Sequence, residues 1–259
     1  MIDSWLHNLP IWEMAIVCFA ASFLVGWAIH VVTGRLAAGP HGRSWMTVSP
    51  GLLSPIGVIF GLLVAFTAAQ VWTDTERASA AVAAEASALR SVVIVSAVLP
   101  EGPRGQIREL VKEHIEHVVD EEWPMMARGD VTLKISPPEL NKALQLTLSL
   151  TLETPGQQTA QREVATYLEQ ALEARRQRIL VSRSEVNPVK WLSLIFLGGC
   201  LQVTVALVHC HNRLGSAVSI GLFSAGFAAA MLLILAHDRP FTGQVAVRPA
   251  SLLQVMPDS

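Results

Sequence analysis

The chain has 259 residues, of which 51% are hydrophobic and 15% are charged, and its formal net charge is -2. The mean hydropathy of +0.43 is above that of soluble globular domains and predicts a membrane protein. The slightly negative charge argues against a nucleic-acid partner, since nucleic-acid-binding proteins carry a basic stripe.

Four apolar segments predict transmembrane helices, because a hydrocarbon core of about 30 Å requires about 20 residues. The predicted fold class is therefore an all-α membrane protein, with a helical module between spans two and three. The spans lie at about residues 11–32, 55–73, 188–209 and 214–236. The predicted domains are 11–73 with spans one and two, 74–187 as the module, 188–236 with spans three and four, and 237–259 as the C-terminal tail.

Residues 51–99 predict one long helix that starts in lipid and continues into water. No proline or glycine interrupts this stretch between Gly61 and Pro100, and its second half is Ala-rich and charged. Before it, residues 33–50 predict a loop rich in Gly, Pro and Ser that contains Arg43.

Within the module, the sequence predicts a turn at residues 100–103 and an amphipathic helix over 107–123. Further helices are expected from Pro138 to about Leu152 and over about 157–184, each preceded by a proline-containing break.

The charged face of helix 107–123 is interpreted as solvated, and a divalent-cation site there is the alternative. The pattern places His114 and His117 three residues apart among several acidic side chains. Because Arg108 and Lys112 interrupt this face, it resembles an ordinary charged surface, and no metal ligand or cofactor is assigned.

A polar seam follows the second span. Leu63, Thr67, Gln70, Asp74 and Arg77 are spaced four, three, four and three residues apart, so they share one helical face. Polar groups at bilayer depth face either a neighbouring helix or a water-filled cavity. The seam therefore leaves two interpretations open, a pore-lining face in an oligomer and a contact with other helices.

Both termini and the module are expected on one side of the membrane, since the number of spans is even. The positive-inside rule predicts that this side is the cytoplasm, because most Lys and Arg lie in the module and the tail. Asp238 and Arg239 follow the fourth span, and they are expected to pair with each other or with Asp74 and Arg77, or to form an ordinary charged end to the span.

No catalytic signature is present, because the sequence lacks a P-loop, a dinucleotide-binding glycine motif, GxSxG and HExxH. The chain is therefore predicted not to be an enzyme. A transporter would predict internal repeats or broken helices, and no convincing repeat occurs.

Four segments together resemble a family of bacterial four-span membrane proteins, the bestrophin-like family. They are FGLLVAFTAAQVW in the second span, EEWPMMARG, LEARRQR, and HDRPFTGQVAV after the fourth span, and the resemblance covers about residues 10–255. It implies the bacterial inner membrane as the location and a pentameric assembly. It also implies a pore lined by the second helix, with a hydrophobic neck at positions such as Phe60, Leu63 and Phe66.

The resemblance departs from bestrophins after the fourth span. Bestrophins carry Asn-Pro-Phe-Gly followed by an acidic calcium-binding run. Here the similar segment is Arg239-Pro240-Phe241-Thr242-Gly243, and no acidic run follows it. A calcium site of that type is therefore not predicted.

Two functional hypotheses follow. The first is an oligomeric ion channel of undetermined selectivity that passes an inorganic ion. Its predicted lining is Phe60 and Leu63 at a hydrophobic constriction, Thr67 and Gln70 in the polar part, and Asp74 and Arg77 at the cytosolic mouth. The alternative is a non-conducting, membrane-anchored helical scaffold that binds a partner through its soluble helices.

Overall fold

The structure is a computed structural model that describes residues 9–38, 50–134, 136–210 and 212–257. These residues are mostly helical with no strand among them, and four helices are long and apolar enough to cross a membrane. The four are α2 (Ile11–Ala37), α4 (Leu53–Ser96), α9 (Pro188–Val208) and α10 (Arg213–His237). The predicted fold class is confirmed. The predicted loop over 33–50 is wrong at its start, because α2 continues to Ala37. Residues 39–49 of that loop, with Arg43, lie outside the described residues, and η1 (Pro50–Leu52) follows them.

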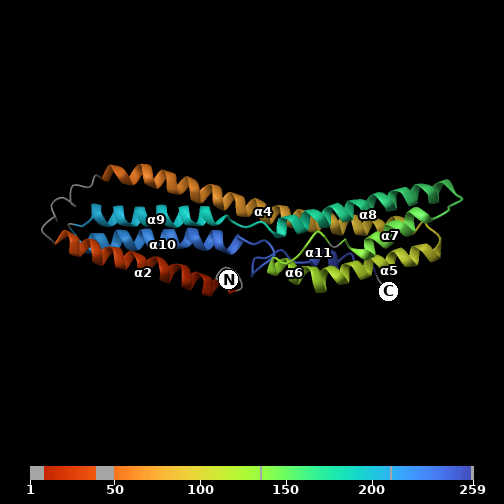
Figure 1. The fold of residues 1–259 in the computed structure, drawn as a ribbon, viewed down its shortest axis with the longest axis horizontal. Helices are drawn as coiled ribbons and strands as arrows, with labels where there is room; N and C mark the ends of the chain where they lie inside the picture. The colour runs from red at the N-terminus through yellow and green to blue at the C-terminus, as the bar shows by residue number, and fades with distance from the viewer. Residues whose placement is uncertain (1–8, 39–49, 135, 211, 258–259) are drawn as a thin grey trace. The chain divides into compact units, whose positions relative to one another are not determined.

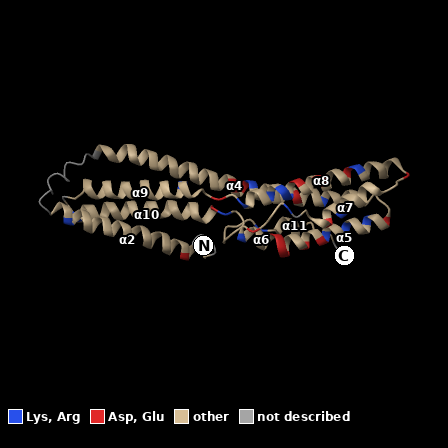
Figure 2. Ribbon diagram, viewed as in Figure 1, with Lys and Arg blue, Asp and Glu red and all other residues tan. Residues whose placement is uncertain are grey.

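The described residues form two compact units. Unit 1 contains the chain up to Trp72 together with Glu185–Asp238, and unit 2 contains Thr73–Ser184 and the segment from Arg239 onward. The helix α4 contributes its first part to unit 1 and its second part to unit 2, without a break in the helix. Charged side chains are sparse on α2, α9 and α10 and frequent on the helices of unit 2 (Figure 2).

In unit 1, α10 packs against both α2 and α9 (Figure 1). A glycine allows one of these close approaches, because a Cβ at Gly26 of α2 would lie 2.5 Å from Ser224 Oγ of α10. At the same level, Ser22 donates to the Ser224 carbonyl at 2.8 Å, and Gln202 of α9 donates to Ser224 Oγ at 3.0 Å. These bonds satisfy polar groups that would be costly if left unpaired in hydrocarbon.

Unit 2 is built from helices around one apolar core. They are α5 (Glu101–His117), the π-helical turn η2 (Val118–Glu122), α6 (Trp123–Arg128), α7 (Pro138–Ser149), α8 (Pro155–Ser182) and α11 (Ala250–Leu253). The core joins α4, α5, α7 and α8 through residues such as Leu89, Ile115 and Leu168. Phe241 and Leu252 of the C-terminal segment belong to the same core, so much of this segment is a packed part of unit 2.

Capping residues explain where several helices begin. Thr154 accepts a hydrogen bond from Gln157 N ahead of Pro155, and Asn187 accepts one from Val189 N ahead of Pro188. The predicted turn at residues 100–103 is wrong in part. The helix α5 already begins at Glu101, because Pro103 lies in the first turn, where its missing N–H would have no intrahelical partner.

Candidate functional site

The predicted pore face of α4 packs against helices of its own unit. The Phe60 ring lies 5.8 Å from Phe227 and 6.3 Å from Phe223 of α10, measured between ring centroids. Leu63 packs with the buried cluster that includes Leu194 of α9 and Ile234 of α10. In unit 1 these two residues therefore serve helix packing.

Thr67 of the predicted pore lining is buried within its own chain. It is 2% exposed, and its hydroxyl donates to the Leu63 carbonyl at 2.8 Å. Its role in a pore stays a prediction. Gln70, one turn further along, accepts a hydrogen bond from the Lys190 ammonium group at the start of α9.

Asp74 and Arg77 form an ion pair one turn apart, with Nη1 and Oδ1 separated by 3.6 Å. Arg77 is mostly exposed, so the net contribution of this pair to stability is small. Asp238 accepts a hydrogen bond from the Val186 N–H at 2.7 Å, which ties the end of α10 to the residues before α9. The predicted pairing of Arg239 stays a prediction.

A different face of α4 is left uncovered by the chain. Val58, Leu62 and Phe66 are 59%, 52% and 71% exposed, at four-residue spacing along the helix. Ala69 and Thr73 continue the same face with exposed positions. This face is apolar at its start and carries no charge, and it is free to meet lipid, another subunit or a pore.

Unit 2 contains a buried network of charged side chains. Arg178 of α8 donates from Nε to Glu85 of α4 at 2.7 Å and from Nη2 to Glu122 of η2 at 2.9 Å. Arg175, one turn earlier on α8, donates from Nε to Glu122 at 2.8 Å, and the Arg178 guanidinium lies 5.5 Å from the Trp123 ring centroid. Two carboxylates therefore meet two guanidiniums, and the charges balance.

The charged groups of this network are shielded from water. The side chains of Arg178 and Glu85 are 0% exposed and that of Glu122 is 2% exposed. Burial alone would raise the pKa of Glu122, but the guanidiniums of Arg178 and Arg175 outweigh burial and lower this pKa below its ordinary value. Burial would likewise lower the pKa of Arg178, and the two carboxylates raise it instead. The Glu122 carboxylate and the Arg178 guanidinium are therefore charged at neutral pH.

His114 completes the network and corrects the interpretation of helix 107–123. Its ring is fully buried, with Nε2 at 3.1 Å from Glu85 Oε1, so it does not lie on a solvated face. Its Nδ1 has no hydrogen-bond partner among the described residues. His117 does lie toward solvent, at 3.6 Å from Glu121. No group of three metal-ligating side chains occurs within the described part of the chain.

Acid should weaken unit 2 through Glu122. A carboxylate with a lowered pKa stabilises the folded state fully above its unfolded pKa of about 4.3, and this contribution is lost as the pH falls toward the folded value. We expect Glu122→Gln to reduce the fall in melting temperature between about pH 5 and pH 3. Circular dichroism of the full-length protein in detergent measures this.

The matched control is Glu163→Gln, at an exposed position on α8, which should keep the acid dependence of the parent chain. Equal acid dependence in the parent and both variants would contradict the role given to Glu122.

Comparisons with known proteins cover most of the chain. A family model described as the bestrophin-like domain matches residues 20–252. The chain belongs to the bestrophin-like family. No curated protein matches the chain.

Solved structures support the bestrophin-like fold. A point variant of a bacterial bestrophin homologue from Klebsiella pneumoniae is similar with a TM-score of 0.68 and 13% identity, over 92% of this chain and 96% of that chain. The homologue phased with zinc gives a TM-score of 0.67 and 12% identity, over 93% and 95% of the two chains. At this level of identity the likeness concerns the fold. This bestrophin-like chain is therefore a multi-pass, all-helical membrane protein.

The sequence did offer a signal for the buried network, which the predictions missed. On α8 the inward positions Leu168 and Ala171 are followed by Arg175 and Arg178 at the same helical spacing. On α4, Glu85 likewise stands between Val82 and Leu89 on an inward face. Charges of opposite sign at apolar positions of two helices predict a buried ion pair.

Proposed function

We propose that this bestrophin-like protein is an oligomeric ion channel, in which one copy of α4 from each subunit surrounds a central pore. The uncovered face of α4, with Val58, Leu62 and Phe66, is the observation that carries the proposal. The family supports it, because bestrophins are ion channels. An oligomer is required because four closely packed spans leave little room for an aqueous path.

The proposed lining differs from the one expected from the sequence. Phe66 is retained, whereas Val58 and Leu62 replace Phe60 and Leu63 at the hydrophobic constriction. Such a constriction gates by dewetting, since a narrow apolar passage excludes water and ions. Asp74 and Arg77 remain proposed at the cytosolic mouth, where their charges would act on the permeant inorganic ion.

The proposed location is the bacterial inner membrane, with both termini and the soluble helices in the cytoplasm. The distribution of Lys and Arg supports this orientation. A homopentamer is the proposed assembly, by resemblance to bestrophins. Light scattering of the purified protein in detergent measures the number of subunits.

Widening the constriction should raise conduction. We expect Phe66→Ala to increase ion flux into proteoliposomes about tenfold or more, because a smaller side chain lets water persist in an apolar passage. The matched control is Phe196→Ala on α9, a ring that is also exposed, at 66%. It should leave flux unchanged, since we place it against lipid.

Unchanged flux in both Phe66→Ala and Leu62→Ala, with the oligomer intact, would contradict this lining. Intact oligomers that conduct no ion at all would favour the alternative function, a membrane-anchored scaffold. A rise in flux with Phe196→Ala alone would place the pore beside α9.

A further inference from the structure

In unit 2, one face of α4 is left uncovered and carries no charge. Its positions follow one another at spacings of four, three, four and three residues, which places their side chains in one row along the helix. They are Ala80, Ala84, Ser87, Ser91 and Ile94, of which Ser91 is half-buried and the others are exposed. Val98, in the turn after α4, is also exposed, at 53%. We refer to this surface as the uncharged face of α4.

The outer face of α8 shows how a solvated helix of the same unit differs. Over a similar length it exposes charged side chains, namely Arg162, Glu163, Glu169, Glu173 and Arg176. Between positions 78 and 98, the charged residues are Glu85, which is buried in the ion network, and Arg90, which flanks the uncharged face. The uncharged face of α4 therefore differs from an ordinary solvated surface.

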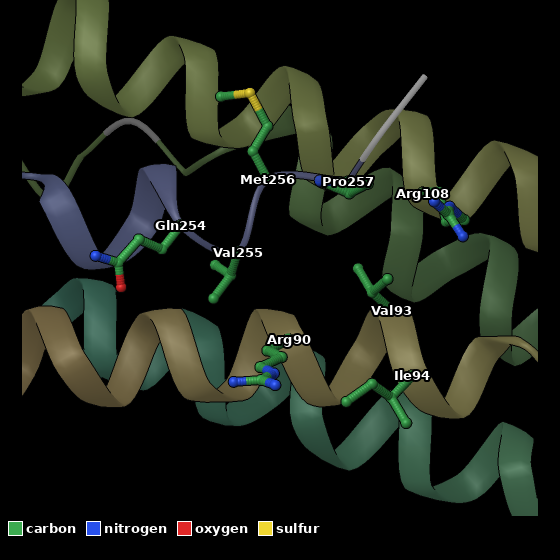
Figure 3. A pocket seen from close by; sticks show the side chains of 8 residues that line it. All are labelled: Arg90, Val93, Ile94, Arg108, Gln254, Val255, Met256 and Pro257. Atoms are coloured by element: carbon green, nitrogen blue, oxygen red, sulfur yellow. The ribbon is translucent and has the colours of Figure 1, made fainter.

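The apolar part of this face does not serve packing within the chain. Ile94 is 60% exposed, and it lies on the side of α4 away from the C-terminal segment, whereas Val93 points toward that segment (Figure 3). In the membrane lipid can cover such a side chain, but the helices of unit 2 carry the frequent charges of a water-exposed region (Figure 2). A contiguous uncharged surface in water is typical of a protein interface.

The remaining residues of the face are suited to close helix packing. Ala80, Ala84 and Ser87 are small, so another helix backbone can approach closely. The Ser91 hydroxyl already donates to the Ser87 carbonyl at 3.0 Å, and covering it would therefore leave no donor unpaired.

Two observations favour a second copy of this chain as the partner. Alternating steps of three and four residues are the repeat with which long helices pack along one another, and a second α4 presents the same repeat. Moreover, α4 is one unbroken helix, and by spacing along it these positions continue the face of Leu62, Phe66, Ala69 and Thr73. The proposed channel already places that face around an axis shared by the copies.

We propose that the uncharged face of α4 in unit 2 packs against α4 of a second copy of the chain. The proposal rests on the oligomer of the proposed function and names a surface through which its copies meet outside the membrane. Removal of alanine and isoleucine surface from water would stabilise this contact.

Cysteine cross-linking of the full-length protein in nanodiscs tests the proposal. Cys18, Cys200 and Cys210 are first replaced by alanine, and a single cysteine is then introduced as Ala84→Cys or Ser87→Cys. With a short bismaleimide we expect covalent dimers of the chain in both variants. The matched control is Thr166→Cys, an exposed position on the outer face of α8, which should stay monomeric on a denaturing gel.

A charge on the face provides a second measurement. Ala84→Glu should lower the number of subunits found by light scattering, because it brings like charges together where copies meet, and Thr166→Glu should leave that number unchanged. An oligomer that forms no covalent dimer at either cysteine, or equally at Thr166→Cys, would overturn the assignment to this face. Cross-linking to another protein in native membranes, in place of a second copy, would overturn the partner.

These outcomes separate the surface from ion conduction. Oligomers that cross-link through Ala84→Cys but conduct no ion contradict the proposed channel alone. Oligomers that conduct but do not cross-link contradict this surface alone. A monomeric parent chain would overturn both.

Discussion

Replacing Arg178 by leucine should lower the free energy of unfolding of unit 2 by about 3–5 kcal/mol, because removing one partner of a buried ion pair strands the other charge. Arg178 contacts both Glu85 and Glu122 within hydrogen-bond distance, and both carboxylates are buried. In the variant Glu122 keeps Arg175, whereas Glu85 keeps His114 among the residues that the structure describes. Thermal unfolding of the detergent-solubilised protein and amide hydrogen exchange of α5 and α8 measure the loss.

The matched control is Arg176→Leu, two positions earlier on the same helix. Arg176 is mostly exposed and pairs with Glu173 at 3.4 Å, so its loss should change stability by less than about 1 kcal/mol. If Arg178→Leu does not fold, Glu85→Gln combined with Arg178→Met provides a second test, because it removes both charges of the pair. This double variant should recover part of the stability, and no recovery would contradict an ion-pair cause.

A single methyl group at Gly198 should disrupt unit 1. A Cβ there would lie 2.1 Å from Cε2 of the Phe227 ring, far inside contact distance. The ring has little freedom to move, because it packs against both Phe60 and Phe223 with centroid distances of 5.8 and 6.4 Å. We expect Gly198→Ala to reduce stability by about 3 kcal/mol or more, and to broaden the size-exclusion profile in detergent.

The adjacent glycine is a close control. A Cβ at Gly199 would have no contact within 4 Å, so Gly199→Ala should leave stability unchanged or slightly higher, as alanine favours helix. Phe227→Leu in the Gly198→Ala background should restore part of the loss by making room. Equal behaviour of the two alanine variants would contradict this account of how α9 and α10 approach.

The spans and the long second helix could be predicted from sequence because the bilayer imposes length and composition on them. The orientation of α4 could not, because both of its faces are apolar in the membrane section. A spacing rule identifies residues that share a face, but it does not say which neighbour they meet. Thr67 illustrates this limit, since its hydroxyl is satisfied by the Leu63 carbonyl within the same helix.

The buried network was missed for a different reason. The charged residues of helix 107–123 are predicted from the sequence to face solvent, as Glu and Arg usually do, and the charged residues of α8 are given no buried role. Burial becomes favourable here only because charges from α4, η2 and α8 meet, and that meeting depends on tertiary structure. His114 is likewise predicted from the sequence to lie on the solvated face, whereas its ring is fully buried against Glu85.

Around the π-helical turn η2, the chain has residues of the same type at adjacent positions. A π-turn accommodates one more residue than an α-turn. Here Glu122 and Met126 point inward and are buried, whereas the side chain of Glu121 is 65% exposed. The inward pair has neighbours of the same chemistry, Glu121 and Met125. A shift of one residue would therefore replace acid by acid and thioether by thioether, and Glu121 would offer the arginines the same chemistry as Glu122.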